Sequence, residues 1–125
     1  MTTLLLVSLA GGLGAVARFV LDTGLRARST PRYPVGTTVI NLSGSLLLGL
    51  VTGLGLGQMV PVSWQLVLGT GFLGGYTTFS TATYETVELF RIGRYGAALL
   101  NGVGMLGASV GLAALGLWFG LRVPG

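Results

Sequence analysis

The sequence predicts an all-α integral membrane protein in which four helices cross the bilayer, the third of them broken at mid-membrane. Three observations support this fold class. The chain has 125 residues, of which 51% are hydrophobic and only 8% are charged, whereas about a quarter of the residues in a soluble domain are charged. Four segments contain the roughly 20 mostly apolar residues that one crossing requires. Prolines and arginines fall between these segments.

The four spans account for the whole chain, so residues 1–125 are expected to form one membrane domain. The spans are expected at about residues 4–21, 35–56, 64–90 and 95–121. Glycines recur every fourth residue in the second and fourth spans, and such rows let helix backbones approach closely in lipid. The rows consist of Gly49, Gly53 and Gly57, of Gly107 and Gly111, and of Gly116 and Gly120. They predict a closely packed bundle and no chemistry of their own.

Composition excludes several classes of function. The chain has no cysteine, histidine or lysine, which excludes disulfides, thiolate chemistry, Cys/His metal sites and the usual general base. We therefore expect no enzyme. Seven arginines and three acidic residues give a net charge of +4, and a basic balance can indicate nucleic-acid binding. Because the arginines lie between the apolar segments, they favour a membrane-topology signal instead, and no nucleic-acid partner is expected.

The arginines also predict how the chain is oriented. The first and third connections face the same side of the membrane, and the second connection and both termini face the other. The first side carries Arg26, Arg28, Arg32, Arg91 and Arg94, and the opposite side carries only Arg122. Cytoplasmic loops are enriched in arginine and lysine. Both termini are therefore expected outside the cytoplasm.

Polar residues follow one face of the second span. Thr37, Asn41 and Ser45 are spaced at i, i+4 and i+8, so they lie on the same side of a helix. An amide at membrane depth is costly and normally faces protein or water. Two interpretations remain open at this point: hydrogen bonds between helices, or a polar pathway. The two N–H donors of an asparagine amide suit an anion without placing a fixed charge in its path.

Polar residues of the first and fourth spans allow two interpretations each. Arg18 either extends to the cytoplasmic interface with its stem in lipid or lies at the mouth of a water-filled vestibule, where it attracts anions. Asn101 and Ser109 are eight residues apart on one face of the fourth span, with Met105 between them. They form either a weaker polar track or contacts between helices.

The third span is expected to be interrupted. Gly74 and Gly75 lie near its middle, and each glycine weakens a helix by about 1 kcal/mol relative to alanine. Unwound backbone at membrane depth survives only where it is buried in protein or lines a cavity, and its freed groups can bind ions. Phe79, Ser80 and Thr81 follow the glycines. Hydroxyls donate hydrogen bonds, and an aromatic edge carries partial positive charge, so this break suits an anion.

Three stretches of the chain resemble the signature sequences of the Fluc (CrcB) family of fluoride channels. They are GGLGAVARF at 11–19, GTTVIN at 36–41 and GFLGGYTTFST at 71–81. The resemblance covers the whole chain. It implies an antiparallel, dual-topology dimer of four-helix subunits with two fluoride pores. It also implies a passive, fluoride-selective channel in the inner (plasma) membrane. This channel would export fluoride from the cytoplasm and lower its toxicity, with fluoride, the lipid bilayer and a second subunit as partners.

The resemblance further implies roles for single residues. The fluoride pore is expected to use polar and aromatic side chains of the last three spans, namely Asn41, Phe79, Ser80, Thr81, Thr37 and Ser109. Arg18 matches a vestibule arginine. Gly74 and Thr77 match positions whose backbone carbonyls hold a structural sodium ion (Na+) at the dimer interface, and no organic cofactor is implied.

Two residues depart from the family pattern. Ala82 occupies the position of a second pore phenylalanine, and Met105 occupies a position where the family often carries a hydroxyl. A dual-topology homodimer also needs nearly balanced flanking charge, and five arginines against one are not balanced. These three observations fit one half of a heterodimer with a paralogue, and they also fit a divergent homodimer.

Three other functions compete with a conducting channel. A small proton-coupled multidrug exporter needs an acidic residue deep in the membrane, but Glu85 and Glu88 lie late in the third span, near Arg91 and Arg94. A non-transporting membrane scaffold needs the packing glycines but not an unwound polar centre. The chain is alternatively a non-transporting partner subunit of a heterodimeric channel.

Overall fold

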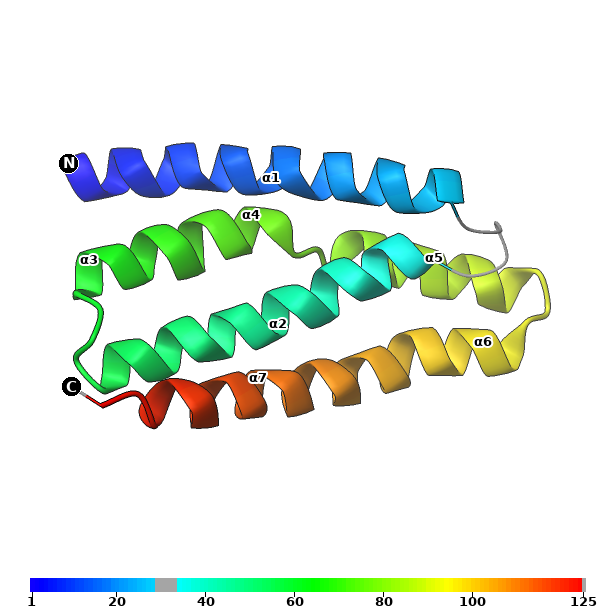
Figure 1. The fold of residues 1–125 in the computed structure, drawn as a ribbon. Helices are drawn as coiled ribbons and strands as arrows, with labels where there is room; N and C mark the ends of the chain where they lie inside the picture. Colours follow the sequence, from blue (N-terminus) through cyan, green and yellow to red (C-terminus); the bar gives the residue numbers. More distant parts are fainter. Residues whose placement is uncertain (29–33, 125) are drawn as a thin grey trace.

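The computed structural model describes residues 1–28 and 34–124 as a bundle of four helical rods (Figure 1). The first rod is α1 (Thr2–Arg28) and the second is α2 (Val35–Leu56). The other rods are composite. Their segments are α3 (Val62–Gln65), the π-helical η1 (Leu66–Leu73), α4 (Gly74–Tyr76) and α5 (Ser80–Arg91), then α6 (Tyr95–Leu99), the π-helical η2 (Leu100–Gly104) and α7 (Met105–Leu121).

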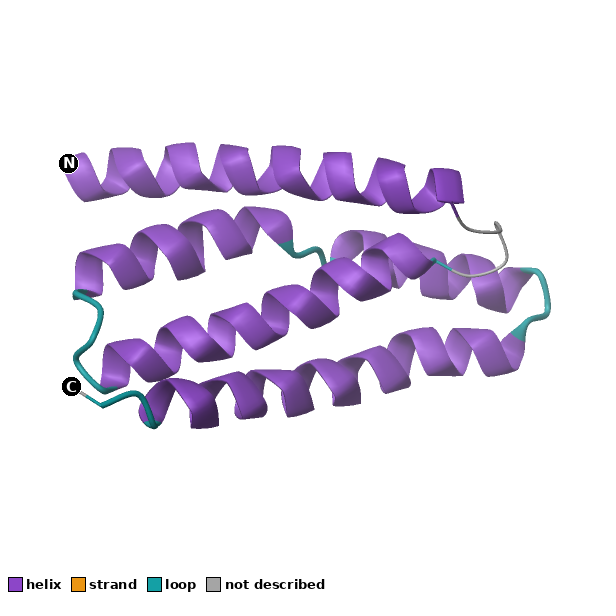
Figure 2. Cartoon of the chain, in the orientation of Figure 1, coloured by secondary structure: helices purple, strands orange, loops and turns teal. Residues whose placement is uncertain are grey.

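Three of the four rods run without interruption and are long and apolar enough to cross a membrane. They are Thr2–Arg28, Val35–Leu56 and Tyr95–Arg122. The third rod consists of two helical halves joined by a short loop (Figure 2). The predicted fold of four helices with an interrupted third is therefore confirmed. Pro31 and Arg32 of the first connection lie outside the described residues.

The ends of the rods have the arrangement expected for four crossings. Both termini and the connection between α2 and α3 lie at one end of the bundle, and the turn between α5 and α6 lies at the other (Figure 1). The described arginines of the predicted cytoplasmic side, Arg26, Arg28, Arg91 and Arg94, belong to the ends of α1 and α5 and to that turn. The fold thus separates the charges by end, which is the pattern that the topology prediction requires.

The position of the break in the third rod differs from the prediction. Gly74 and Gly75 do not interrupt the helix, because α4 continues through them to Tyr76. The backbone leaves the helix at Thr77, where φ is −81° and ψ is 159°. Gly75 instead permits close packing: a Cβ added there would overlap the carbonyl oxygen of Gly11 in α1. The two glycines were therefore wrongly interpreted as the break itself.

The glycine rows pack α2 against α7. A Cβ on Gly49 would overlap the Ala113 carbonyl, and one on Gly116 would overlap the Leu46 carbonyl. A Cβ on Gly53 or Gly120 would lie 2.6 Å from a carbonyl oxygen of the facing helix, which is also too close. Gly107 and Gly111 differ, because within the described chain nothing lies within 4 Å of a Cβ built on either of them. A Cβ on Gly57 would meet only carbonyls of its own helix, at 3.5 Å and 3.8 Å. The prediction of close packing is therefore confirmed for Gly49, Gly53, Gly116 and Gly120 and not for Gly57, Gly107 or Gly111.

Candidate functional site

The break in the third rod is closed by a side chain of another rod. Asn41 in α2 donates a hydrogen bond from Nδ2 to the Thr78 carbonyl (2.7 Å), and its Oδ1 accepts one from the Thr78 N–H (2.9 Å). Thr78 is only 8% exposed, so neither backbone group can rely on bulk water. The amide of Asn41 therefore replaces the helical partners that Thr78 lost at the break.

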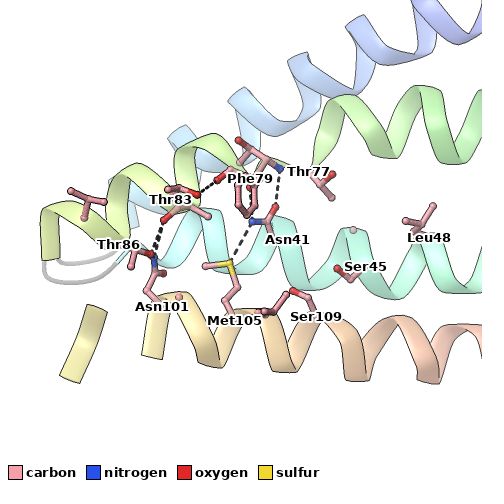
Figure 3. Close-up of a pocket in the computed structure, with 16 residues that line it drawn as sticks. Asn41, Ser45, Leu48, Thr77, Phe79, Thr83, Thr86, Asn101, Met105 and Ser109 are labelled. Atoms are coloured by element: carbon pink, nitrogen blue, oxygen red, sulfur yellow. Dashed lines mark hydrogen bonds between the residues drawn. The ribbon is translucent and has the colours of Figure 1, made fainter. Parts of the chain in front are cut away.

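The second hydrogen of the Asn41 amide points elsewhere. Nδ2 lies 3.4 Å from the thioether sulfur of Met105 in α7 (Figure 3). A thioether is a weak acceptor. One N–H of this amide is thus bound to a strong acceptor, the Thr78 carbonyl, and the other faces a weak acceptor. That second N–H is the available donor of Asn41.

Hydroxyl groups follow the break at the start of α5. Thr78 Oγ1 accepts a hydrogen bond from the Thr81 backbone N–H (3.3 Å) and lies 3.2 Å from Thr81 Oγ1 and 3.5 Å from Ser80 Oγ. The first turn of a helix has unpaired N–H groups, and a threonine hydroxyl satisfies one of them here. Phe79 lies between these residues and is 85% exposed. Its side chain is therefore largely uncovered by its own subunit.

A cavity of about 440 Å³ lies beside the break, between α2, α5, η2 and α7. Three predicted pore residues line it, namely Asn41, Phe79 and Ser109. Its other polar lining residues are Ser45, Thr77, Thr78, Thr83, Thr86 and Asn101, and no lining residue carries a charge. Both residues that depart from the family pattern, Ala82 and Met105, also line this cavity.

The remaining predicted pore residues lie outside this lining. Thr37 is 2% exposed, and its hydroxyl donates a hydrogen bond to the Glu85 carboxylate. Ser80 and Thr81 bond to Thr78, as described above. The structure therefore brings half of the predicted pore residues together around one cavity. A pore role for each of the six stays a prediction.

Charged residues cluster around Glu85 toward the arginine-rich end of the bundle. Arg26 Nη2 lies 3.8 Å from Glu85 Oε2, and Arg26 Nε bonds to Asp22 Oδ2 at 2.9 Å. The sequence predicted that Glu85 and Glu88 both lie near Arg91. Only Glu88 pairs with Arg91, at 3.0 Å. The pairing of α1 with α5 was missed, because no local spacing relates two residues so far apart in the sequence.

Arg18 reaches the break from α1. Its Nη1 lies 3.5 Å from the Thr77 carbonyl oxygen, and the side chain is partly buried. Arg18 is therefore directed toward the break, and the interpretation that it extends to the cytoplasmic interface does not describe its position. Whether Arg18 also borders a vestibule stays a prediction. Among the described residues, no three acidic, histidine or cysteine side chains group together to hold a metal.

Comparison with known proteins decides the family. A family described as "CrcB-like protein, Camphor Resistance (CrcB)" matches residues 5–120. The chain belongs to the CrcB family. This membership confirms the resemblance predicted from the three sequence stretches, and it places the chain in a family of membrane channels and not of enzymes.

Relatives of this chain are similar in sequence along most of their length. The chain is 60% identical over 116 residues to fluoride-specific ion channel FluC 1 of Leifsonia xyli subsp. xyli, covering 93% of this chain and 85% of the relative. It is 50% identical over 123 residues to FluC 2 of Cutibacterium acnes, covering 97% and 99%. It is 46% identical over 112 residues to FluC 3 of Bifidobacterium longum, covering 90% and 93%.

Six polar residues of this CrcB chain line the cavity without having been assigned to the pore, namely Ser45, Thr77, Thr78, Thr83, Thr86 and Asn101. Thr83 and Thr86 lie four and seven residues after Phe79, and helical periodicity from Phe79 would have found them. Asn101 donates hydrogen bonds to Thr86 Oγ1 (2.7 Å) and the Ala82 carbonyl (3.3 Å), so it ties η2 to α5. Ser45 shares the face of Asn41, as its spacing indicated.

Proposed function

We propose that this CrcB chain forms a passive, fluoride-selective channel that exports fluoride from the cytoplasm. The names of its relatives support this function, and one structural observation carries it. At the broken third rod, the neutral amide of Asn41 is fixed by two hydrogen bonds to Thr78, and its remaining N–H is available beside a cavity without charged lining residues. Such a donor can hold an anion and also release it.

The chemistry of fluoride makes neutral donors suitable. Fluoride is strongly hydrated, and moving a bare ion into an apolar medium costs tens of kcal/mol. A pore must therefore supply donors in place of water, while binding weakly enough for the ion to leave. Asn41 offers an amide donor and Ser109 a hydroxyl donor at one cavity. The hydroxyls of Thr83 and Thr86 also lie there, but they donate to backbone carbonyls one turn earlier in the chain. HF enters the cell by crossing the membrane and dissociates in the more neutral cytoplasm, which leaves the fluoride anion trapped inside. The anion would then leave through the channel down its gradient.

A second subunit in the opposite orientation completes the proposed channel. The Phe79 ring is 85% exposed, and Gly107 and Gly111 have nothing within 4 Å of an added Cβ in the described chain. Rows of glycine that do not pack within their own subunit suit a helix of another subunit. The partner is either a second copy or a paralogue, and the mass of the complex purified from its native membrane distinguishes the two.

A structural sodium ion at the subunit interface is part of the proposal, and the break has backbone groups that fit it. The helical partner of the Gly74 carbonyl would be the Thr78 N–H, but that N–H bonds to Asn41 Oδ1. Thr77 lies in extended backbone, and its carbonyl has one long contact, to Arg18. Freed carbonyl oxygens are suitable ligands for such a cation. The complex is expected to be less stable in sodium-free buffer than in sodium buffer, and equal stability would contradict the site.

The chain is a multi-pass membrane protein, and we place it in the inner (plasma) membrane with both termini outside the cytoplasm. The described arginines support this orientation, because they lie at the end of the bundle opposite the termini, apart from Arg18 in the middle of α1 and Arg122 near the C-terminus. The CrcB membership gives no support to a multidrug exporter. Glu85 is also engaged by Thr37 and Arg26.

Efflux of fluoride from liposomes tests the function. The complex is reconstituted in the assembly in which it is purified, and fluoride release is followed with a fluoride-selective electrode. We expect rapid release from the wild type and none from Asn41→Asp, because a carboxylate would place a negative charge beside the ion. Thr52→Val on the exposed face of α2 is the matched control, since Thr52 bonds only to the Leu48 carbonyl of its own helix. A wild type that releases no fluoride would refute the channel, and full release by a folded Asn41→Asp would remove Asn41 from the path.

A further inference from the structure

Met105 meets the one Asn41 hydrogen that the break does not use. We propose that the Met105 thioether is a displaceable cover on this fluoride-binding N–H, and that it thereby sets how tightly the pore holds fluoride. The inference deepens the proposed function and rests on it. It assigns to a residue of the fourth rod the role of setting fluoride affinity in the pore.

Geometry fixes the direction of the covered N–H. The Asn41 amide is held by Thr78 on both its oxygen and its nitrogen, at 2.9 Å and 2.7 Å. The amide plane cannot rotate without breaking both bonds, so its other N–H has one direction. That direction leads to the Met105 sulfur at 3.4 Å (Figure 3). An anion that uses this donor must take the place of the sulfur.

The cavity beside Met105 leaves room for its side chain to move. Met105 lines the 440 Å³ cavity together with Asn101, one turn before it on the same face of the rod, and Ser109, one turn after it. Its side chain is 7% exposed within the subunit, so the thioether is enclosed while it covers the amide. A methionine has three rotatable side-chain bonds and fills irregular space readily. Rotation into the adjoining cavity would uncover the N–H without moving a helix.

The strength of the contact suits a temporary cover. A thioether sulfur is a weak acceptor, whereas an ionised acceptor forms hydrogen bonds about twice as strong as neutral ones. Fluoride can therefore displace the sulfur. In the empty pore, the sulfur gives the N–H a partner, and a buried donor without one is unfavourable. The empty state is stabilised and fluoride binding is correspondingly weakened, which favours release of the ion.

The competing explanation is that Met105 only fills space. A test must therefore remove the sulfur and keep the volume. Met105→Leu does so approximately, and norleucine at position 105 does so closely because a methylene replaces the sulfur. Norleucine is introduced in a Met59→Leu background, since Met59 is exposed and lies outside the cavity lining. Met59→Leu alone is the matched control.

Initial rates of fluoride efflux from liposomes are measured over a series of fluoride concentrations. With the sulfur removed, the half-saturating fluoride concentration is expected to fall about fivefold, which corresponds to about 1 kcal/mol. The Met59→Leu control is expected to match the wild type. An unchanged half-saturating concentration in both the leucine and the norleucine proteins, with efflux retained, would overturn the inference and leave the channel function standing. A wild type that releases no fluoride would instead overturn the proposed function, and this inference with it.

Discussion

Replacing Asn41 by alanine is expected to destabilise the fold and not only the pore. The substitution removes the partner of the Thr78 N–H and of the Thr78 carbonyl, which bond to the amide at 2.9 Å and 2.7 Å. Hydrogen bonds between helices in membranes contribute about 0.6–2 kcal/mol each, and a buried group left without a partner costs about 1–3 kcal/mol. Two such groups predict a loss of about 1–6 kcal/mol in the free energy of unfolding, the lower values from the lost bonds and the higher ones from the unpartnered groups.

Unfolding in detergent micelles measures this loss. The chain has two tryptophans, and Trp64 and Trp118 lie in different rods, which provides a fluorescence signal. Thr52→Ala is the control, because the Thr52 hydroxyl bonds only within α2 and is exposed. Its cost is expected to stay below about 0.5 kcal/mol.

Hydrogen exchange at a single amide separates the clamp from general destabilisation. The Thr78 N–H is expected to exchange much faster in Asn41→Ala than in Thr52→Ala, while amides within α7 keep their relative protection. The reasoning would be refuted by an Asn41→Ala protein that unfolds like the control and keeps the Thr78 amide protected. In that case, the break would be held by other contacts.

Two further predictions concern packing and topology. Gly116→Ala is expected to lower the free energy of unfolding by about 1–3 kcal/mol or more, as in overpacked cores, because its Cβ would overlap the Leu46 carbonyl. Gly96→Ala has free space around it and is expected to leave the stability unchanged or to raise it. Equal unfolding free energies of the two variants would contradict the packing of α2 on α7. Alkaline phosphatase fused after Gly125 is expected to be active, because the C-terminus is predicted outside the cytoplasm, and an inactive fusion would contradict this orientation. Fluorescence of a C-terminal green fluorescent protein fusion in its place, beside an active phosphatase fusion, would show that chains take both orientations, as a dimer of two copies requires.

The sequence predicted the parts of the fold that depend on hydrophobicity along the chain. The lengths of the apolar segments predicted the rods, and the glycine spacing predicted close packing of helices without indicating that α2 packs on α7. The existence of a break in the third rod was also predicted, from the length of the span and from Gly74 and Gly75. Its exact place was not. Glycine weakens a helix in water, but in a bundle Gly75 is retained for its small size against α1, so local propensity pointed three residues too early.

The candidate site could be predicted in its residue types but not in its contacts. Thr37 and Asn41 share a helix face, as their spacing required, yet one meets Glu85 and the other meets Thr78. One helical turn of α2 separates two different environments, because Thr37 faces α5 and Asn41 faces the break before it in the same rod. Periodicity specifies which side of a helix a residue occupies. It contains no information about which segment lies opposite, 37 positions away in the chain.

The site has one further consequence for the chemistry of the family fold. In the proposed channel, Asn41 both holds the break together and supplies a donor to the ion, so the two tasks compete for one amide with two hydrogens. Thr78 takes one of these hydrogens, since the break has no other described partner for its carbonyl. A single N–H therefore remains for the anion, and the other donors must be hydroxyls around the cavity. The bond to Thr78 holds the Asn41 amide rigid, so the amide cannot collapse into the empty cavity. The same bond limits the affinity for fluoride, because the amide cannot rotate to offer the ion both of its hydrogens.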